Sequence, residues 1–198
     1  MRAVIALCLA LSTAPLAAHA DPVDPRVALL DRDASHARLW FWTLTVAYSV
    51  TAVAQTTLAL TLHDPGLRVD AAVGAVTTWL GVGGMVLTPV PRVWRAAEEA
   101  HRTGNLDAAI ASAAEAENSA RAWYNHVGVA VVAVTAGLVL WIGYDRPISA
   151  AIAFGSDLIG GELSILTIPT RAARWRDRPV ARWQLAPSLN GVQIVGAW

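Results

Sequence analysis

The sequence contains one run of mostly apolar residues, 148–167, that carries two carboxylic acids, Asp157 and Glu162. A helix of about 20 residues is long enough to cross the hydrocarbon core of a bilayer. An acid at that depth is costly unless it is neutral, paired or hydrated. The two acids are five positions apart, which places them about 140° apart around a helix of 3.6 residues per turn. We therefore expect them to face different neighbours.

Composition supports lipid rather than water as the solvent of this chain. Of 198 residues, 55% are hydrophobic and only 15% are charged, which is a low share for a soluble domain. The formal net charge is zero, so no basic surface indicates a nucleic-acid partner. Cys8 is the only cysteine and lies in a segment that we expect to be removed, which excludes disulfides, zinc thiolate sites and a cysteine nucleophile.

Three further apolar stretches predict an all-α membrane protein with four transmembrane helices in two hairpins. The four predicted spans are about 39–62, 70–88, 123–144 and 148–167. In the third span, Trp123 and Trp141 are separated by about 27 Å at the helical rise, close to the thickness of the hydrocarbon core. Aromatic residues at such positions favour the two membrane interfaces. Tight turns with Asp and Pro, 63–66 and 144–147, close the two hairpins.

Between spans two and three, the sequence predicts a helical hairpin over 92–122 outside the membrane. Gly104 and its neighbours interrupt the helix, and the second half is rich in Ala, a strong helix former. We expect its charged and polar residues to form a solvated face: Glu115, Glu117, Asn118 and Arg121.

Both ends of the chain have their own signatures. Residues 1–20 have a positive start, an apolar core and small residues before position 21, as in a cleaved signal peptide. A polar N-terminal segment, 21–38, follows, with a short helix expected from about Pro25. The C-terminal part, 171–198, reads as an Arg-rich link and a β-hairpin. Asn190-Gly191 is a strong two-residue turn signal and would pair Leu189 with Val192.

Two rules for membrane orientation conflict. Four spans put both mature termini and the 92–122 hairpin on one side, together with twelve arginines, whereas Arg68 and Arg146 lie on the other. The positive-inside rule makes the Arg-rich side cytoplasmic. A cleaved leader makes it periplasmic, and we favour this reading for a protein of a bacterial inner membrane.

The candidate polar site within the membrane consists of Asp157 and Glu162, with Tyr48 and Gln55 of the first span as possible partners. Such acids can relay protons or cations or contact a substrate, and they can also serve as hydrogen-bonded contacts between helices. Because we count no cation inside a span, we expect no buried ion pair. The histidines do not have the spacing of a haem or metal site. We predict no catalytic, cofactor-binding or metal-binding residue.

Small residues recur at helical spacing on two spans and predict close helix packing. They are Thr77, Gly81, Gly84 and Thr88 on the second span and Ser156, Gly160 and Ser164 on the fourth. The segments 80–89 and 158–169 also resemble one another, either through duplication or by chance in apolar sequence.

Two functions follow as hypotheses. The first is a non-enzymatic membrane component that binds a protein partner, or a second copy of itself, through 92–122 and the small-residue helix faces. The alternative is a small transporter or a proton- or cation-coupled module centred on Asp157. A membrane enzyme ranks third, because no nucleophile is paired with a base.

Overall fold

The protein is described here by a computed structural model, which describes residues 24–177, 182–188 and 191–197. Eight helical segments occupy the described chain up to residue 177. They are α2 (Pro25–Thr61), α3 (Pro65–Leu87), α4 (Pro91–Thr103), α5 (Leu106–Ala120), α6 (Trp123–Leu138), the π-helix η1 (Val139–Gly143), α7 (Pro147–Leu166) and α8 (Arg171–Arg176). The predicted leader, 1–20, lies outside the described residues.

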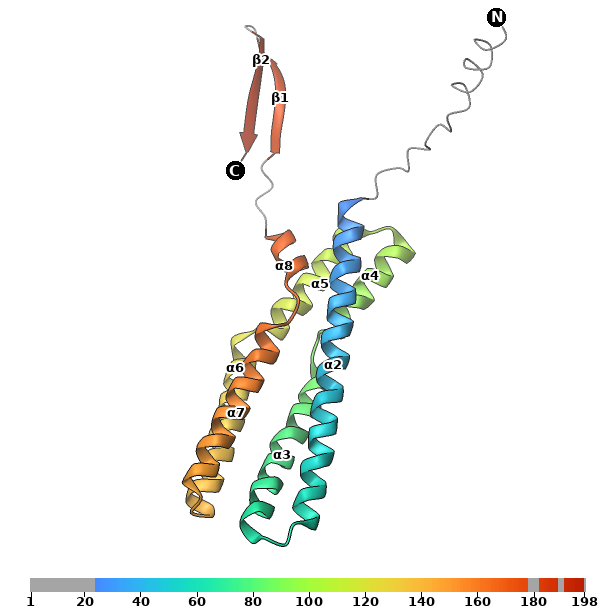
Figure 1. Cartoon of the computed structure of the whole chain (residues 1–198). Helices are drawn as coiled ribbons and strands as arrows, with labels where there is room; N and C mark the ends of the chain where they lie inside the picture. Colours follow the sequence, from blue (N-terminus) through green and yellow to red (C-terminus); the bar gives the residue numbers. More distant parts are fainter. Residues whose placement is uncertain (1–23, 178–181, 189–190, 198) are drawn as a thin grey trace, which may run out of the picture.

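Four of these helical stretches are long and apolar enough to cross a membrane, as the sequence predicts. α2 pairs with α3, and α6 pairs with α7, so the spans form two hairpins that lie side by side (Figure 1). The predicted short helix from Pro25 and the first span are one continuous helix, α2. The second span begins at Pro65, earlier than expected, because Asp64 caps the helix by accepting a hydrogen bond of 2.8 Å from the Leu67 amide.

The outer surface of the hairpins is apolar, and this property identifies their solvent. Only 6% to 22% of the most apolar stretch of each span is buried inside the protein. Large aliphatic side chains point outward, among them Leu60, Leu87 and Ile142, which are 80%, 85% and 77% exposed. A surface of this kind is stable in contact with lipid tails rather than water. The structure therefore supports a multi-pass membrane protein.

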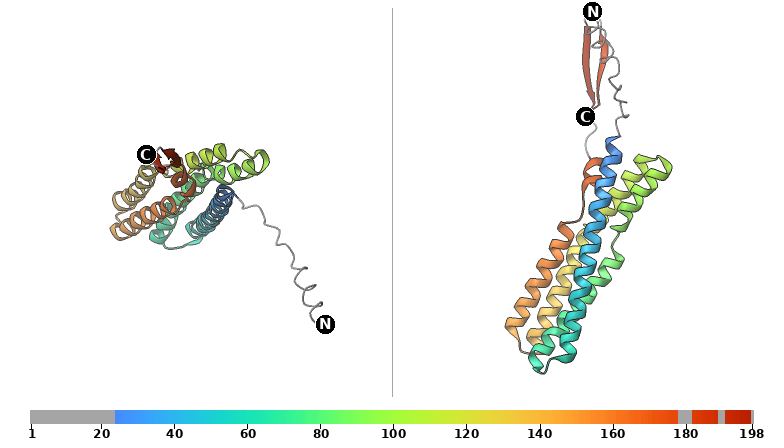
Figure 2. Two further views of the ribbon diagram at one scale, coloured as in Figure 1. Left: turned by 90° about the horizontal axis from the view of Figure 1, so that it is seen from above. Right: turned by 45° about the vertical axis from the view of Figure 1, so that its right-hand side comes forward.

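At one end of the bundle, helices α4, α5 and α8 pack with the first turns of α2 to form a unit that we call the head (Figures 1 and 2). Gly104 has a positive φ of 72° and ends α4, and Asn105 caps α5 by accepting from the Ala108 amide. The core of the head is built mainly of alanines that allow the helices to approach closely. The buried residues include Ala96, Ala97, Ala100, Ala109, Ala113, Ala116 and Ala172.

The segment after α7 differs in part from the prediction. Its first residues are not only a link, because Arg171–Arg176 form α8. Strands β1 (Arg182–Ser188) and β2 (Gly191–Ala197) pair antiparallel, with Ser188 opposite Gly191 and Leu185 opposite Ile194. The predicted register is therefore wrong by two residues, because Gly191 belongs to the ladder and not to the turn. A two-stranded ribbon alone is only marginally stable in water, so a stable C-terminal hairpin stays a prediction.

Candidate functional site: a groove between two hairpins

The α2–α3 hairpin is held together by two residues that the sequence singled out. Tyr48 packs on Gly81 of α3, where an added Cβ would lie 3.0 Å from Tyr48 Cδ1. Gln55 lies against Gly74 and accepts a hydrogen bond of 2.7 Å from Thr78 Oγ1. Each contact needs a glycine opposite it, because a side chain there would separate the helices.

The α6–α7 hairpin has contacts of the same kind. Gly161 lies under Val129, where an added Cβ would be 2.4 Å from Val129 Cγ1. His126 lies on α6 about one helical turn before Val129, and its Nδ1 is 2.7 Å from Glu162 Oε2. His126 lies just inside the Trp123 belt, and both side chains are partly exposed, so the expectation that no ion pair is buried within the spans stays a prediction. Glu162 belongs to the internal contacts of this hairpin.

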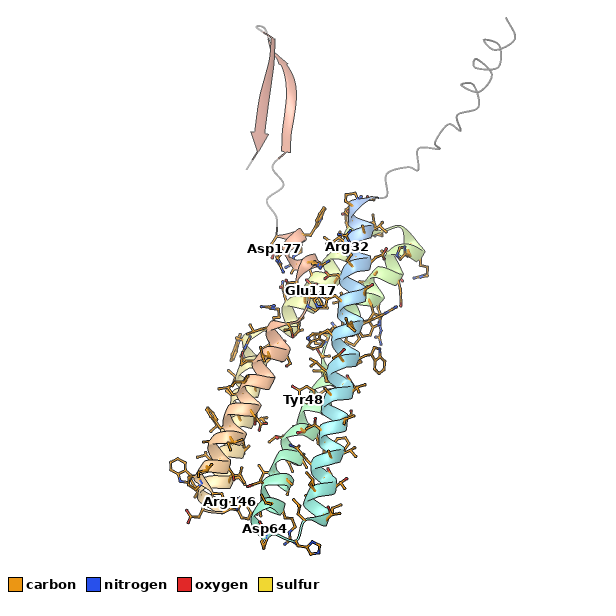
Figure 3. The ribbon with its side chains drawn as sticks, in the orientation of Figure 1. Arg32, Tyr48, Asp64, Glu117, Arg146 and Asp177 are labelled. Carbon is orange, nitrogen blue, oxygen red and sulfur yellow. The ribbon has the colours of Figure 1, made fainter. Side chains whose placement is uncertain are left out.

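Two polar contacts, which we call the clasps, join one hairpin to the other at opposite ends. Near the head, Trp40 Nε1 donates to Thr167 Oγ1 at 3.0 Å. At the far end, Arg146 donates to both carboxylate oxygens of Asp70 at 2.8 and 2.7 Å, and Ser149 adds a third bond to Asp70 at 2.9 Å. Figure 3 places Arg146 and Asp64 at the end of the bundle opposite to Glu117.

Between the clasps the hairpins diverge and leave a groove with a volume of about 480 Å³. Its walls come mainly from α3, α6 and α7, and Tyr48 of α2 lies between the hairpins about midway along them (Figure 3). Gly84, Gly128 and Gly160 line the groove, and a Cβ added to any of them would meet nothing within 4 Å. The predicted small-residue faces therefore differ in role: Gly81 packs against a helix, whereas Gly84 and Gly160 leave open space.

Asp157 is the one acidic or basic residue among the described residues that line this groove. Its Oδ1 accepts a long hydrogen bond of 3.4 Å from Thr77 Oγ1, which also donates to the Gly74 carbonyl. Its Oδ2 is buried and has no hydrogen-bond partner in the described part of the chain. A carboxyl oxygen that is shielded from solvent and left without a donor is costly. The groove therefore contains one polar atom that would gain from a ligand with a donor.

The structure brings only part of the predicted site together. Asp157 and Tyr48 share the groove, whereas Gln55 and Glu162 do not line it and serve contacts inside their own hairpins. As expected from their angular separation, Asp157 faces α3 and Glu162 faces α6. Thr77, the donor to Asp157, was anticipated only as a member of a packing stripe.

Sequence reasoning missed a second group of acids, which lies in the head. Asp33 of α2 and Glu117 of α5 are both 0% exposed, so the assignment of Glu117 to a solvated face is wrong. The helical spacing of the two acids indicates their burial. Asp33 lies three residues after Leu30 and four before Ala37, and Glu117 lies four residues after Ala113 and three before Ala120; these four apolar residues are buried. Each acid therefore occupies the apolar stripe of its helix.

Both acids hold the start of α8. Asp33 Oδ2 accepts from the Ala172 amide at 2.8 Å, and Glu117 Oε2 accepts from the Ala173 amide at 2.7 Å. Burial, together with a hydrogen bond to Asp33, raises the pKa of Glu117 to about 8, although the bond from the Ala173 amide acts in the opposite direction.

Comparison with protein-family models, with curated proteins and with solved structures gives no match. Among the described residues, no group of three His, Cys, Asp or Glu side chains could hold a metal ion. The function is therefore argued from the geometry of the chain alone.

Proposed function

We propose that this chain is a non-enzymatic membrane component that binds an amphipathic ligand in the groove between its hairpins. The ligand is an apolar molecule with one cationic or hydrogen-bond-donating group that contacts Asp157. The observation that carries the proposal is the unpartnered, buried Oδ2 of Asp157 in a groove of about 480 Å³.

The shape and chemistry of the groove support this choice. Pockets that bind small molecules have volumes of about 300–1,000 Å³, apolar walls and a few converging polar groups. Here the walls are mostly small or aliphatic residues, Thr77 donates to the single acid, and Tyr48 and Asn125 add a hydroxyl and an amide elsewhere in the lining. An acid at membrane depth favours a donor or a cation over an acceptor, so an anionic ligand is disfavoured.

Two features argue against an active site in the groove. Asp157 has no histidine, lysine or second acid beside it among the described lining residues, so no base and nucleophile are paired. The hydroxyl that bonds to it, Thr77 Oγ1, also donates to a helix carbonyl. We therefore place binding rather than catalysis at this site.

Binding of a protein partner through 92–122 stays a prediction. The alanine faces of α4 and α5 are buried in the core of the head. What remains outside is charged, and part of it is paired within the chain, as in the bonds of Arg102 to Glu99 and of Arg38 to Glu98. This surface offers a protein partner little apolar area, so we favour the groove as the binding site.

A proton- or cation-coupled transporter centred on Asp157 is the second candidate, because the same acid would serve it. The two hypotheses differ in what moves. A binding component holds the ligand at Asp157, whereas a transporter carries it, or a proton, from one side of the membrane to the other. The test below includes one measurement for each.

The binding test uses the full chain in detergent and a dodecyl chain with a dansyl group at one end and an amine at the other. We expect saturable binding of the amine, and weaker binding of the matched alcohol and carboxylate. Asp157→Asn removes a charge-assisted hydrogen bond of about 1.5–3 kcal/mol, so affinity for the amine falls by about 10- to 150-fold. Equal binding of the three probes, or unchanged affinity of Asp157→Asn, contradicts the proposal.

A matched pair of glycines separates the groove from the lipid-facing surface. Gly84→Leu adds a side chain that starts in the groove, where its Cβ meets nothing within 4 Å, whereas the neighbouring Gly83 does not line the groove and also has open space at its Cβ. We expect Gly84→Leu to weaken amine binding at least about tenfold and Gly83→Leu to leave it unchanged. In proteoliposomes, proton or amine movement that is lost in Asp157→Asn would favour the transporter.

We further propose that residues 1–20 are removed on export and that the head and both mature termini face the periplasm of a bacterial inner membrane. The sequence of the leader supports this orientation, and the twelve arginines of the head side oppose it. Alkaline phosphatase fused after Trp198 is expected to be active, and fusion to a cytoplasmic reporter inactive. The reverse pattern would place the head in the cytoplasm.

A further inference from the structure

The two buried acids of the head, Asp33 and Glu117, each have one carboxyl oxygen without a hydrogen-bond partner, and a single proton shared between them would supply the missing bond. Asp33 Oδ2 and Glu117 Oε2 accept from backbone amides of α8, but Asp33 Oδ1 and Glu117 Oε1 are buried without a partner in the described part of the chain. When one carboxyl is protonated, the two side chains hydrogen-bond to each other. Without that proton, two negative charges would lie together in a site closed to water.

We propose that Asp33 and Glu117 form a proton-dependent latch that holds α8 against the head and releases it when the shared proton is lost. The latch joins three elements far apart in sequence: Asp33 comes from α2, Glu117 from α5, and the two amides from α8. Losing the proton leaves like charges in contact, and their separation requires α8 or one of the acids to leave the core.

No cation is placed to replace the proton. The charged and titratable side chains of α2, α4, α5 and α8 around the latch are exposed, except Arg26 and Arg121, which are half-buried. Arg26 bonds to Asp24 and Asp107, and Arg121 donates to the Leu166 carbonyl. The exposed ones are Asp31, Arg32, His36, Arg38, Arg92, Arg95, Glu98, Glu99, His101, Arg102, Asp107, Glu115, Arg171, Arg174 and Arg176.

The direction of the pH effect follows from linkage. The docked state holds a proton on an acid whose pKa is raised to about 8, whereas the released acid ionises near its ordinary value, well below neutrality. Between these two values the docked state binds one more proton than the released state. The ratio of docked to released α8 therefore falls by up to about tenfold for each unit of pH from about 5 to 8, and is level above that range.

The latch is connected to the groove through the chain itself. Thr167 accepts the clasp bond from Trp40, and Ile168 is buried and lines the groove at its head end. Both residues lie within a few positions of Ala172, which the latch holds. Release of α8 would free this wall of the groove, so the latch offers control of the groove by pH. The latch does not depend on the proposed ligand, and its test measures α8 directly.

The test places two spin labels on the full chain in a Cys8→Ser background, at the exposed positions Ser112 of α5 and Arg176 of α8, and measures their separation by double electron–electron resonance. We expect one narrow distance at about pH 5 and a growing share of longer, broader distances by about pH 9. Far-ultraviolet circular dichroism at each pH verifies that the bundle itself stays folded. A distance that does not change between these pH values overturns the proposal.

Two amide variants test the latch residues, with one matched control. Glu117→Gln keeps an acceptor for the Ala173 amide and donates to Asp33, so α8 stays docked at about pH 9. Asp33→Asn keeps an acceptor for the Ala172 amide and donates to Glu117, with the same result expected. Glu115→Gln, on the exposed face of the same helix, keeps the pH response of the wild type. If both amide variants follow the wild-type pH curve, or if both lack the docked distance at about pH 5, the latch is wrong. His101→Gln retains the response if the latch, and not the His101 contact with Asp31, is responsible.

Discussion

Glycines in the spans have two opposite roles that their spacing alone does not separate. Gly81 and Gly161 are contact glycines, because the Tyr48 ring and the Val129 side chain occupy the space that a side chain at these positions would need. Gly84 and Gly160 are space glycines, with an open groove in that position. The sequence predicts small faces correctly, but the residue opposite each glycine comes from another helix and is not encoded in the spacing.

The contact role predicts a strong effect of Gly161→Ala. The added Cβ would lie 2.4 Å from Val129 Cγ1, so either α7 or the valine must move. We expect a loss of about 1–3 kcal/mol in stability, typical of overpacking. Gly155→Ala in the same helix meets nothing within 4 Å and should be neutral or slightly stabilising. Unfolding by sodium dodecyl sulfate, followed by circular dichroism, measures both, and equal stabilities of the two variants would refute the contact.

The Glu162–His126 contact predicts a second asymmetry between variants. Glu162→Gln keeps an oxygen within reach of His126 Nδ1, so we expect a loss below about 1 kcal/mol. Glu162→Leu leaves that nitrogen without its present partner and should cost about 1–3 kcal/mol. The same unfolding experiment measures the difference. A leucine variant as stable as the glutamine variant would mean that Glu162 is bound to headgroups or water instead.

At the scale of elements, the sequence indicated nearly every helix, because caps and apolar length are local properties. Asp–Pro pairs start α2 and α3, Gly104 ends α4, and the span lengths follow bilayer thickness. The predictions that were wrong concern features that depend on partners distant in sequence. Asp33 and Glu117 are buried because α8 packs on both, and the strand register depends on the whole ladder rather than on one turn signal.

The clasp at the far end predicts that the two loop arginines are not equivalent. Arg146 bonds to Asp70 across the hairpins with both groups less than a third exposed, whereas Arg68 is exposed and its side chain has no hydrogen bond or ion pair among the described residues. Arg146→Gln should lower stability by about 1–3 kcal/mol, because Asp70 keeps only Ser149 as a donor. Arg68→Gln should change it by less than about 0.5 kcal/mol. Equal effects would show that the clasp is not formed in the membrane.

For the whole molecule, lipid as the solvent was predictable from composition, but the groove was not. Apolar side chains outside and alanines inside follow once lipid surrounds the spans. The separation of the hairpins depends instead on which polar groups meet across them, and these partners are 76 to 127 positions apart in the chain. Asp157 was found from its cost in lipid, and its open surroundings emerged only from that separation.

The two clasps predict a cooperative opening of the bundle. Thr167→Val removes the acceptor of Trp40 with little change of shape, and Arg146→Gln removes the far clasp. Each single variant leaves the other clasp and the head, so the hairpins should keep their separation. With both clasps lost, the long Thr77–Asp157 bond and sparse contacts between α3 and the second hairpin remain along the spans. Spin labels at the lipid-facing Val50 and Ile159, again with Cys8→Ser, should then give a longer or broader distance in the double variant alone. If the double variant keeps the narrow distance, packing along the groove and not the clasps sets the separation of the hairpins. If a single variant already gives the longer distance, loss of that one clasp is enough to open the bundle, and the opening is not cooperative.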